Sequence, residues 1–255
     1  NQAQTIHLNP QQQQQVYRLN ITDNDKFLIN SHELAANSQW QLVNARGQLI
    51  GSGYAGDLSA EPLSLTTGDY YLLVNNQGLS AEVTGQVSVH QLTTISHTAQ
   101  LDIPWNGSIS EFGQRQAYVF EISQATTVLL DYLNQGGDFI WQLSGPDGQL
   151  YDYVTLADSH FQLYPFVLSK AGQYTLTVRS KNAMTGDFSV SLRNLSHATS
   201  LPNGQQTLSF DAAESQLWTV NAQAGQTLVW RMSNPPSEDF YLAAFNAQGQ
   251  LITES

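Results

Sequence analysis

Hydrophobic and polar residues alternate along most of the chain. Apolar residues occupy every second position of segments 17–21, 70–74, 118–122 and 174–178. A period of two places one face of a β-strand in a core and the other in water. No segment keeps a helical period over three turns. The pattern therefore predicts short β-strands throughout the chain.

The chain contains an internal repeat of about one hundred residues. Residues 16–49 align with residues 117–150 without a gap at an offset of 101, and Trp40 falls on Trp141. A third, shorter copy begins near Ser196. We therefore divide the chain into a first unit (residues 1–92), a second unit (93–195) and a third unit (196–255).

Turn signals rich in Gly, Asp and Pro separate the expected strands within each unit. Short strands at this spacing are typical of an antiparallel β-sandwich. We predict an all-β fold of tandem, jelly-roll-like β-sandwich domains, with two complete repeats and a partial third. Because the third unit has the strands of only part of a sandwich, we expect the chain to be a fragment. We also expect that unit to pack on the second unit or to self-associate with a neighbouring molecule.

Composition narrows the function classes. The net charge is −12 and Lys and Arg form no cluster, which argues against nucleic-acid binding. No apolar run approaches the roughly 20 residues of a membrane-spanning helix, so no membrane insertion is expected. The chain has no cysteine, which excludes disulfide scaffolds, thiol nucleophiles and Cys-ligated zinc.

Motifs of catalysis and cofactor binding are absent or out of context. Residues 51–56 have the glycine spacing of a dinucleotide-binding loop, but no strand–loop–helix pattern surrounds them, so we expect a hairpin loop. The six histidines are scattered, and no hydrolase nucleophile elbow or metalloprotease helix motif occurs. We therefore expect no enzymatic activity and name no catalytic residue.

Aspartates are the candidates for a structural calcium site, the one cofactor that the sequence leaves open. Asp57 and Asp158 recur at the offset of 101, and the second unit adds Asp131 and Asp138. Calcium takes oxygen ligands, which carboxylates and loop carbonyls provide. The same residues suit local Asx-turns, so both interpretations stay open.

A group of aromatic residues distinguishes the second unit. The first unit offers only Tyr54 opposite Tyr151, Tyr153, Phe161 and Tyr164. Exposed rings stack on sugars, so these residues are candidates for a glycan-binding patch. In strands with a period of two, half of them would face the core, and core packing is the alternative interpretation.

The order of motifs in the second unit resembles that of a known family. It reads Tyr118-x-Phe120, Trp141-x-Leu143, Pro146-Asp147-Gly148, Gly172-x-Tyr174-x-Leu176-x-Val178 and Gly186-Asp187-Phe188. This order resembles the bacterial pre-peptidase C-terminal type of β-sandwich domain, and especially its tandem copies in large surface proteins and RTX-type adhesins. The first unit departs from it with Val87 at the expected place of Phe188, and the third unit has Leu242 in place of the strand tryptophan.

The resemblance implies non-catalytic structural or adhesion modules of a large secreted or cell-surface bacterial protein. A glycan or a cell-surface protein is the kind of ligand that it implies. The alternative is an accessory segment of a secreted hydrolase, such as a peptidase, whose catalytic domain lies outside these residues. A stand-alone carbohydrate-binding module is a third interpretation.

Overall fold

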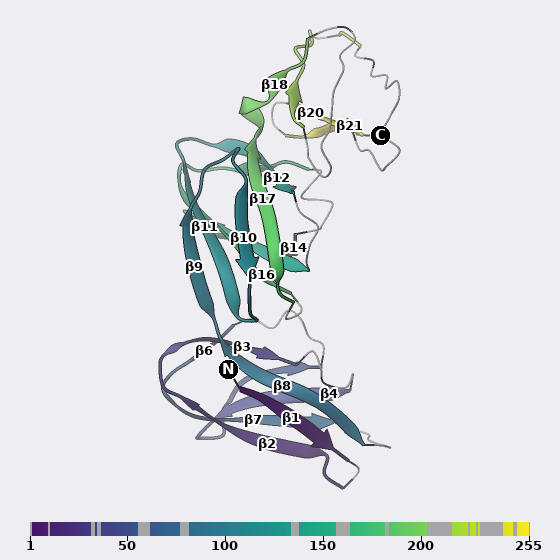
Figure 1. Cartoon of the computed structure of the whole chain (residues 1–255). Coiled ribbons are helices and arrows are strands. Elements are labelled where there is room, and N and C mark those ends of the chain that lie inside the picture. The colour runs from purple at the N-terminus through teal and green to yellow at the C-terminus, as the bar shows by residue number, and fades with distance from the viewer. Residues whose placement is uncertain are drawn as a thin grey trace.

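The computed structural model describes residues 2–9, 11–31, 34, 37–55, 62–76, 82–133, 138–156, 164–181, 184–202, 204, 216–223, 225–227, 229, 242–246 and 249–254. β-Strands account for most of the described chain (Figure 1). None of the described helical segments has the length and apolar character needed to cross a membrane. The predicted all-β class is confirmed.

The described residues of the first unit form an eight-stranded sandwich. Its strands are β1 (Gln2–Leu8), β2 (Gln14–Ile21), β3 (Asp25–Asn30), β4 (Ser38–Asn44), β5 (Leu49–Tyr54), β6 (Leu63–Leu65), β7 (Gly68–Asn76) and β8 (Val83–Gln91). They form two antiparallel sheets with the orders β1-β8-β3-β6 and β2-β7-β4-β5. This order is that of a jelly roll. The antiparallel pairs β1–β8, β2–β7, β3–β6 and β4–β5 lie alternately in one packed sheet and in the other.

The second unit has the same strand order with one strand added. Its strands are β9 (Thr93–Thr98), β10 (Trp105–Ile109), β11 (Gln114–Ile122), β12 (Thr126–Tyr132), β13 (Phe139–Gly145), β14 (Gly148–Thr155), β15 (Phe166–Leu168), β16 (Gly172–Ser180) and β17 (Gly186–Asn194). The sheets are β10-β17-β12-β15 and β14-β13-β16-β11-β9. The added strand, β9, lies at the edge of the second sheet and runs parallel to β11.

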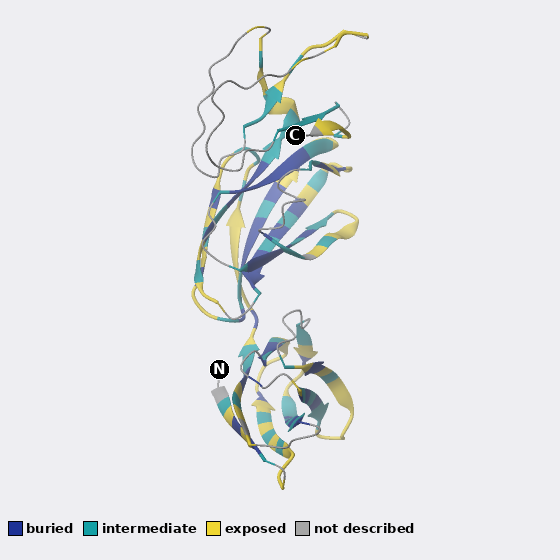
Figure 2. Cartoon of the chain, turned by 90° about the vertical axis from the view of Figure 1, so that its right-hand side faces the viewer, coloured by how far each residue is buried: buried dark blue, intermediate teal, exposed yellow. Residues whose placement is uncertain are grey.

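Each of these two units has its own hydrophobic core between its sheets (Figure 2). The repeated tryptophans Trp40 and Trp141 lie in the two cores with exposures of 2% and 0%. The strands that pair with theirs, β7 and β16, bury alternate residues from Tyr70 to Val74 and from Tyr174 to Val178. The period of two in the sequence therefore indicates which residues of each sheet face the core.

The two cores fill one equivalent position in opposite ways. In the first unit, Ile6 lies opposite Gly85 across β1 and β8. In the second unit, Gly107 lies opposite Phe188 across β10 and β17. The large residue has moved from one strand to the other, which keeps the space filled. The expected match of Val87 with Phe188 is therefore wrong, because strand pairing places Gly85 there.

The third unit is described only in part. It contains the 3₁₀ turn η1 (Leu195–His197) and the strands β18 (Thr199–Ser200), β19 (Trp218–Thr219), β20 (Ala243–Phe245) and β21 (Leu251–Glu254). β18 runs parallel to β19, as β9 runs parallel to β11. β20 and β21 form an antiparallel hairpin.

The hairpin of the third unit reproduces the β4–β5 hairpin of the first unit. The side-chain amide of Asn44 donates to Gln48 Oε1 at 2.8 Å, and that of Asn246 donates to Gln250 Oε1 at the same distance. Both hairpins also shift register immediately before the turn. The same sequence, Asn-Ala-x-Gly-Gln, therefore builds the same turn in both units.

Candidate functional site

The first and second units are joined without a free linker. β8 ends at Gln91 and β9 begins at Thr93. The amide of Leu92 donates to the carbonyl of Lys26 in the first unit at 2.7 Å, and the amide of Thr93 donates to the carbonyl of Gly113 in the second unit at 2.9 Å. Two successive residues thus bond to different units, which leaves no freely rotating segment at the junction.

Side chains from both units pack over this junction. The ring of Phe112 in the second unit stands edge-on to the imidazole of His90 in the first unit. His90 Nε2 lies 2.7 Å from Ser88 Oγ, and burial lowers the pKa of His90. Gly113 has φ +93, and a Cβ there would lie 2.8 Å from the carbonyl oxygen of Gln91. A glycine is therefore required where the two units meet.

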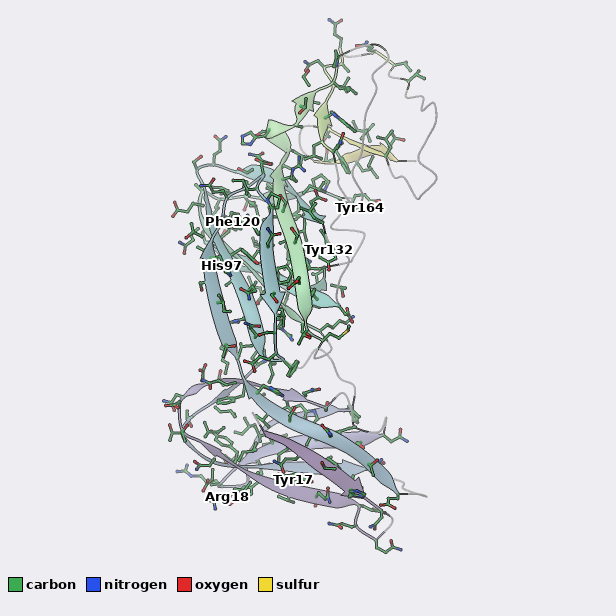
Figure 3. The ribbon with its side chains drawn as sticks, in the orientation of Figure 1. Tyr17, Arg18, His97, Phe120, Tyr132 and Tyr164 are labelled. Carbon is green, nitrogen blue, oxygen red and sulfur yellow. The ribbon has the colours of Figure 1, made fainter. Side chains whose placement is uncertain are left out.

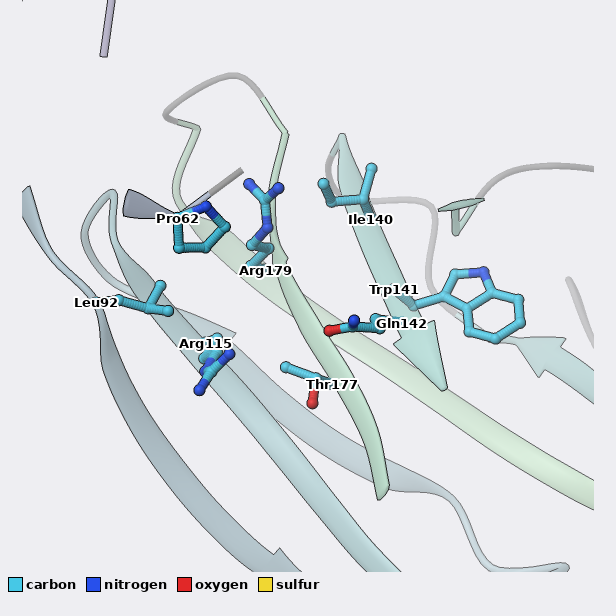
Figure 4. A pocket seen from close by; sticks show the side chains of 8 residues that line it. All are labelled: Pro62, Leu92, Arg115, Ile140, Trp141, Gln142, Thr177 and Arg179. Atoms are coloured by element: carbon cyan, nitrogen blue, oxygen red, sulfur yellow. The ribbon is translucent and has the colours of Figure 1, made fainter. Parts of the chain in front are cut away.

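A small cavity lies beside the junction (Figure 4). Its volume of about 10 Å³ suits one water molecule and excludes an organic ligand. The buried Arg179 lines it, together with Arg115, whose Nε donates to Thr94 Oγ1 at 2.6 Å. The other lining residues are Pro62, Leu92, Ile140, Trp141, Gln142 and Thr177. The cavity is therefore a packing feature of the junction.

Asp102 joins the segments that meet at the second junction. Asp102 has φ +65, a left-handed conformation that Asp tolerates better than most residues. Its carboxylate accepts from the amide of Asn194 at 2.7 Å and lies 2.7 Å from His197 Nδ1. The amide of Asp102 donates to the carbonyl of Leu192 at 2.9 Å. The end of β17 and the turn η1 are thereby bonded to the segment between β9 and β10 of the second unit.

An aromatic column supports the added strand β9. The imidazole of His97 stacks on Tyr118, and Tyr118 stacks on Trp105 (Figure 3 labels His97). The hydroxyl of Tyr118 donates to the carbonyl of Asn106 at 3.0 Å. Burial raises the pKa of Tyr118 to about 12. This column ties β9 to the core through side chains as well as backbone pairing.

The described calcium candidates lie in ion pairs. Asp131 is 2% exposed, with its Oδ2 3.5 Å from a guanidinium nitrogen of Arg193. Asp138 Oδ1 lies 4.0 Å from the ammonium of Lys181. Within the described ranges, no three His, Asp or Glu side chains gather as metal ligands would. Asp57 and Asp158 lie outside the described residues, so calcium binding there stays a prediction.

The described aromatic residues that were candidates for glycan binding contact different parts of the protein. Tyr151 packs edge-on against Phe166, with ring centroids 5.0 Å apart, and burial raises its pKa. Tyr164 lies edge-on to Phe245 of the third unit at 6.2 Å (Figure 3). Phe161 lies outside the described residues, as does the side chain of Tyr153. A glycan patch formed by these residues stays a prediction.

The contact of Tyr164 with Phe245 belongs to a wider contact between the second and third units. A Cβ at Gly249, in the turn before β21, would lie 3.0 Å from Thr127 and 3.8 Å from Pro165. The hairpin of the third unit therefore lies against the second unit, the first of the two arrangements expected from the sequence.

The glycine motif at residues 51–56 is part of a strand in the described residues. Gly51 and Gly53 lie in β5, which pairs with β4, so the expected hairpin loop is wrong there. A Cβ on Gly53 would come within 2.8 Å of the indole nitrogen of Trp40, and one on Gly51 would meet Leu63. These glycines admit neighbouring side chains, which is a structural role.

Sequence reasoning missed the junction residues, Asp102 and Phe112 above all. Neither falls in the alternating pattern, and neither matches its counterpart at an offset of 101. One signal was present: Gly113 is followed by a strand, and a glycine beside a strand marks a close backbone approach.

Comparisons with known proteins give no family for the chain. No family model matches it, and no curated protein matches it by sequence. The pre-peptidase C-terminal domain of a Bacillus anthracis collagenase matches by structure at 18% identity and TM-score 0.30, covering 40% of this chain and 97% of that domain. Salmonella Typhimurium PliG, a periplasmic inhibitor of g-type lysozyme, matches at 19% identity and TM-score 0.31, with 39% and 97% coverage.

A third structure, the CUB1-EGF-CUB2 domain of human MASP-1/3, matches at 8% identity and TM-score 0.26, covering 76% of this chain and 100% of that one. At these scores the likenesses carry no conclusion. The fold assignment rests instead on the strand order of the two sandwiches.

Proposed function

We propose that these residues are non-catalytic structural modules of a large secreted or cell-surface bacterial protein, which space a binding domain away from the cell. What supports the proposal is the way in which the units are joined. β9 follows the first unit directly and becomes an edge strand of the second unit. A junction of this kind transmits the orientation of one unit to the next, which a flexible linker does not.

The surface chemistry is consistent with an extracellular spacer. The net charge is −12, while charged residues make up only 12% of the chain. An acidic, amide-rich surface keeps a long array soluble and keeps like modules apart. Binding of a glycan or a cell-surface protein by the second unit is a further part of the proposal.

Fractionation of the source organism tests the proposal. An antibody against these residues should detect a protein of several hundred kilodaltons in the cell-surface fraction. A soluble species of about one hundred kilodaltons in the medium would instead favour an accessory segment of a secreted hydrolase. A signal confined to the cytoplasm would contradict both interpretations.

A further inference from the structure

Each described connection between units supplies a strand to the unit that follows. β9 pairs in parallel with β11 from Gln114↔Thr93 to Val119↔Thr98. β18 pairs in parallel with β19, from Thr199↔Trp218 to Ser200↔Thr219. The same arrangement thus occurs at both junctions, although their side-chain contacts differ.

The first unit has the equivalent strand, β2, at a sheet edge. β2 corresponds to β11, since Tyr17 and Tyr118 are 101 residues apart and both hydroxyls donate to a backbone carbonyl of the preceding strand, at 2.9 and 3.0 Å. In the sheet order β2-β7-β4-β5, β2 is paired on one side only. Among the described residues, no strand lies where β9 lies in the second unit.

Most side chains of β2 are more exposed than the equivalent side chains of β11. Val16 is 56% exposed, whereas Ala117, at the equivalent position of β11, is 6% exposed and pairs with Ser96 of β9. Tyr17 is half-buried, whereas Tyr118 is buried. An exposed Val on an otherwise uncovered strand edge is a surface that favours strand addition.

The backbone groups that face outward from β2 can be assigned. The carbonyl of Gln13 accepts from the amide of Asn76, which follows the paired end of β7, so odd-numbered residues face inward. Because successive residues alternate, the amides and carbonyls of Gln14, Val16 and Arg18 point to the open side. Figure 3 labels Tyr17 and Arg18 on this strand.

We propose that the open edge of β2 accepts an extended, uncharged, Thr/Ser-rich segment that runs parallel to it, as β9 runs along β11. The occupant is of the β9 type because its sequence, Thr-Thr-Ile-Ser-His-Thr, carries no charged side chain beside the amide-rich start of β2. This inference does not depend on the location or adhesive role of the protein, since it rests on strand pairing alone.

The test supplies a strand of the β9 type to the whole chain. Residues 92–101 are copied directly ahead of Asn1, which restores the spacing of the second unit, because residue 102 is equivalent to residue 1 at the offset of 101. Hydrogen exchange of the amides of Gln14, Val16 and Arg18 is then compared with that of the unextended chain. We expect exchange to slow by about tenfold or more, as for other paired strand amides.

A matched control carries the same extension with proline at the copied positions of Ile95 and His97. The amide of Thr93 donates to the carbonyl of Gly113, directly before β11, so the amides of these two residues also face β11. Proline removes both donors without changing length. Equal exchange rates in all three chains would overturn the proposal, as would equal protection in the proline control. Concentration-dependent protection of the unextended chain would show that a second copy occupies the edge instead.

Discussion

The ring of Phe112 meets the imidazole of His90 edge-on, with centroids 5.1 Å apart and planes at 89°. These two residues come from different units, on either side of the continuous backbone that joins β8 to β9. The contact adds side-chain packing to a junction that the backbone hydrogen bonds of Leu92 and Thr93 already restrain. Edge-to-face pairs of this geometry stabilise a contact beyond the area that they bury.

Phe112→Ala should loosen the first junction. Two spin labels, on cysteines introduced at the exposed positions Arg46 and Glu121, report the distance between the units, because the chain has no cysteine of its own. We expect a narrow distance distribution in the parent chain and a broader one in the variant. Phe112→Leu keeps most of the volume and serves as the control. An unchanged distribution in Phe112→Ala would show that the backbone bonds alone fix the junction.

Acid should weaken the same junction. Burial lowers the pKa of His90 from its ordinary value of 6.5, while Glu111 opposes the shift. Since the folded state disfavours the charged imidazole, the stability that neutral His90 provides is present above pH 6.5 and is lost as the pH falls through the lowered pKa. The urea midpoint should therefore fall less between pH 7.5 and pH 5 in His90→Asn than in the parent chain. Identical falls would exclude His90 as the group that titrates.

Alkali should act on the aromatic column. Burial raises the pKa of Tyr118 from 10.0 to about 12, so its stabilising effect is present below pH 10 and is lost as the pH rises toward 12. Absorbance near 295 nm should show that Tyr118 is among the phenols that titrate late, and Tyr118→Phe should remove a phenol that titrates near pH 12. The variant should also lose about 1 kcal/mol of stability, because the Asn106 carbonyl loses its donor. An unchanged number of phenols that titrate near pH 12 in Tyr118→Phe would assign that titration to another tyrosine.

Gly107→Ala tests whether Gly107 leaves room for Phe188, the reverse of the pair Ile6 and Gly85 in the first unit. A Cβ at Gly107 would overlap the hydroxyl of Tyr118 and the ring of Phe188. We expect a loss of about 1–3 kcal/mol in a chemical unfolding experiment, typical of an overpacked core. Adding Phe188→Leu should recover part of this loss, and Ser108→Ala, at the exposed neighbouring position, should change little. Additive losses in the double variant would contradict the shared space.

Tyr151→Ala separates packing from glycan binding in the second unit. Because Tyr151 packs on Phe166 and Trp141, its removal should lower stability by about 1–3 kcal/mol. Tyr54→Ala, at a 63% exposed position of the first unit, is the matched control and should leave the melting temperature unchanged. If Tyr151→Ala abolishes glycan binding at an unchanged melting temperature, the ring serves a ligand and not the core.

The sequence allowed prediction of the strands that have a core face. Alternation identified β7 and β16, and the repeat identified Trp40 and Trp141 as equivalent residues, both of which lie in cores. It did not identify β9, because all six residues of that strand are exposed, although His97 stacks on Tyr118. A hydrophobic pattern cannot identify a strand that has no buried apolar face.

The alignment of the repeats was also incomplete. The offset of 101 places Ile6 of β1 on Gly107 of β10. Ile6 pairs with Gly85 in the first unit, whereas Gly107 pairs with Phe188 in the second, so Phe188 is the equivalent of Gly85. Exchange of a large and a small residue between two strands leaves no similarity at either position. Of the candidate sites, Asp131 and Tyr151 proved to have structural contacts that only the folded chain brings together.

The parallel pairing of β9 with β11 determines how the chain responds to tension. A pull on the first unit reaches the second unit through Thr93 and runs along the axis of β9. Six residue pairs from Gln114↔Thr93 to Val119↔Thr98 then bear the load side by side, so their hydrogen bonds must break together rather than one after another. Sliding of this kind resists force more than unzipping does. The edge strand that joins the two units is thus also the element through which tension between them would pass.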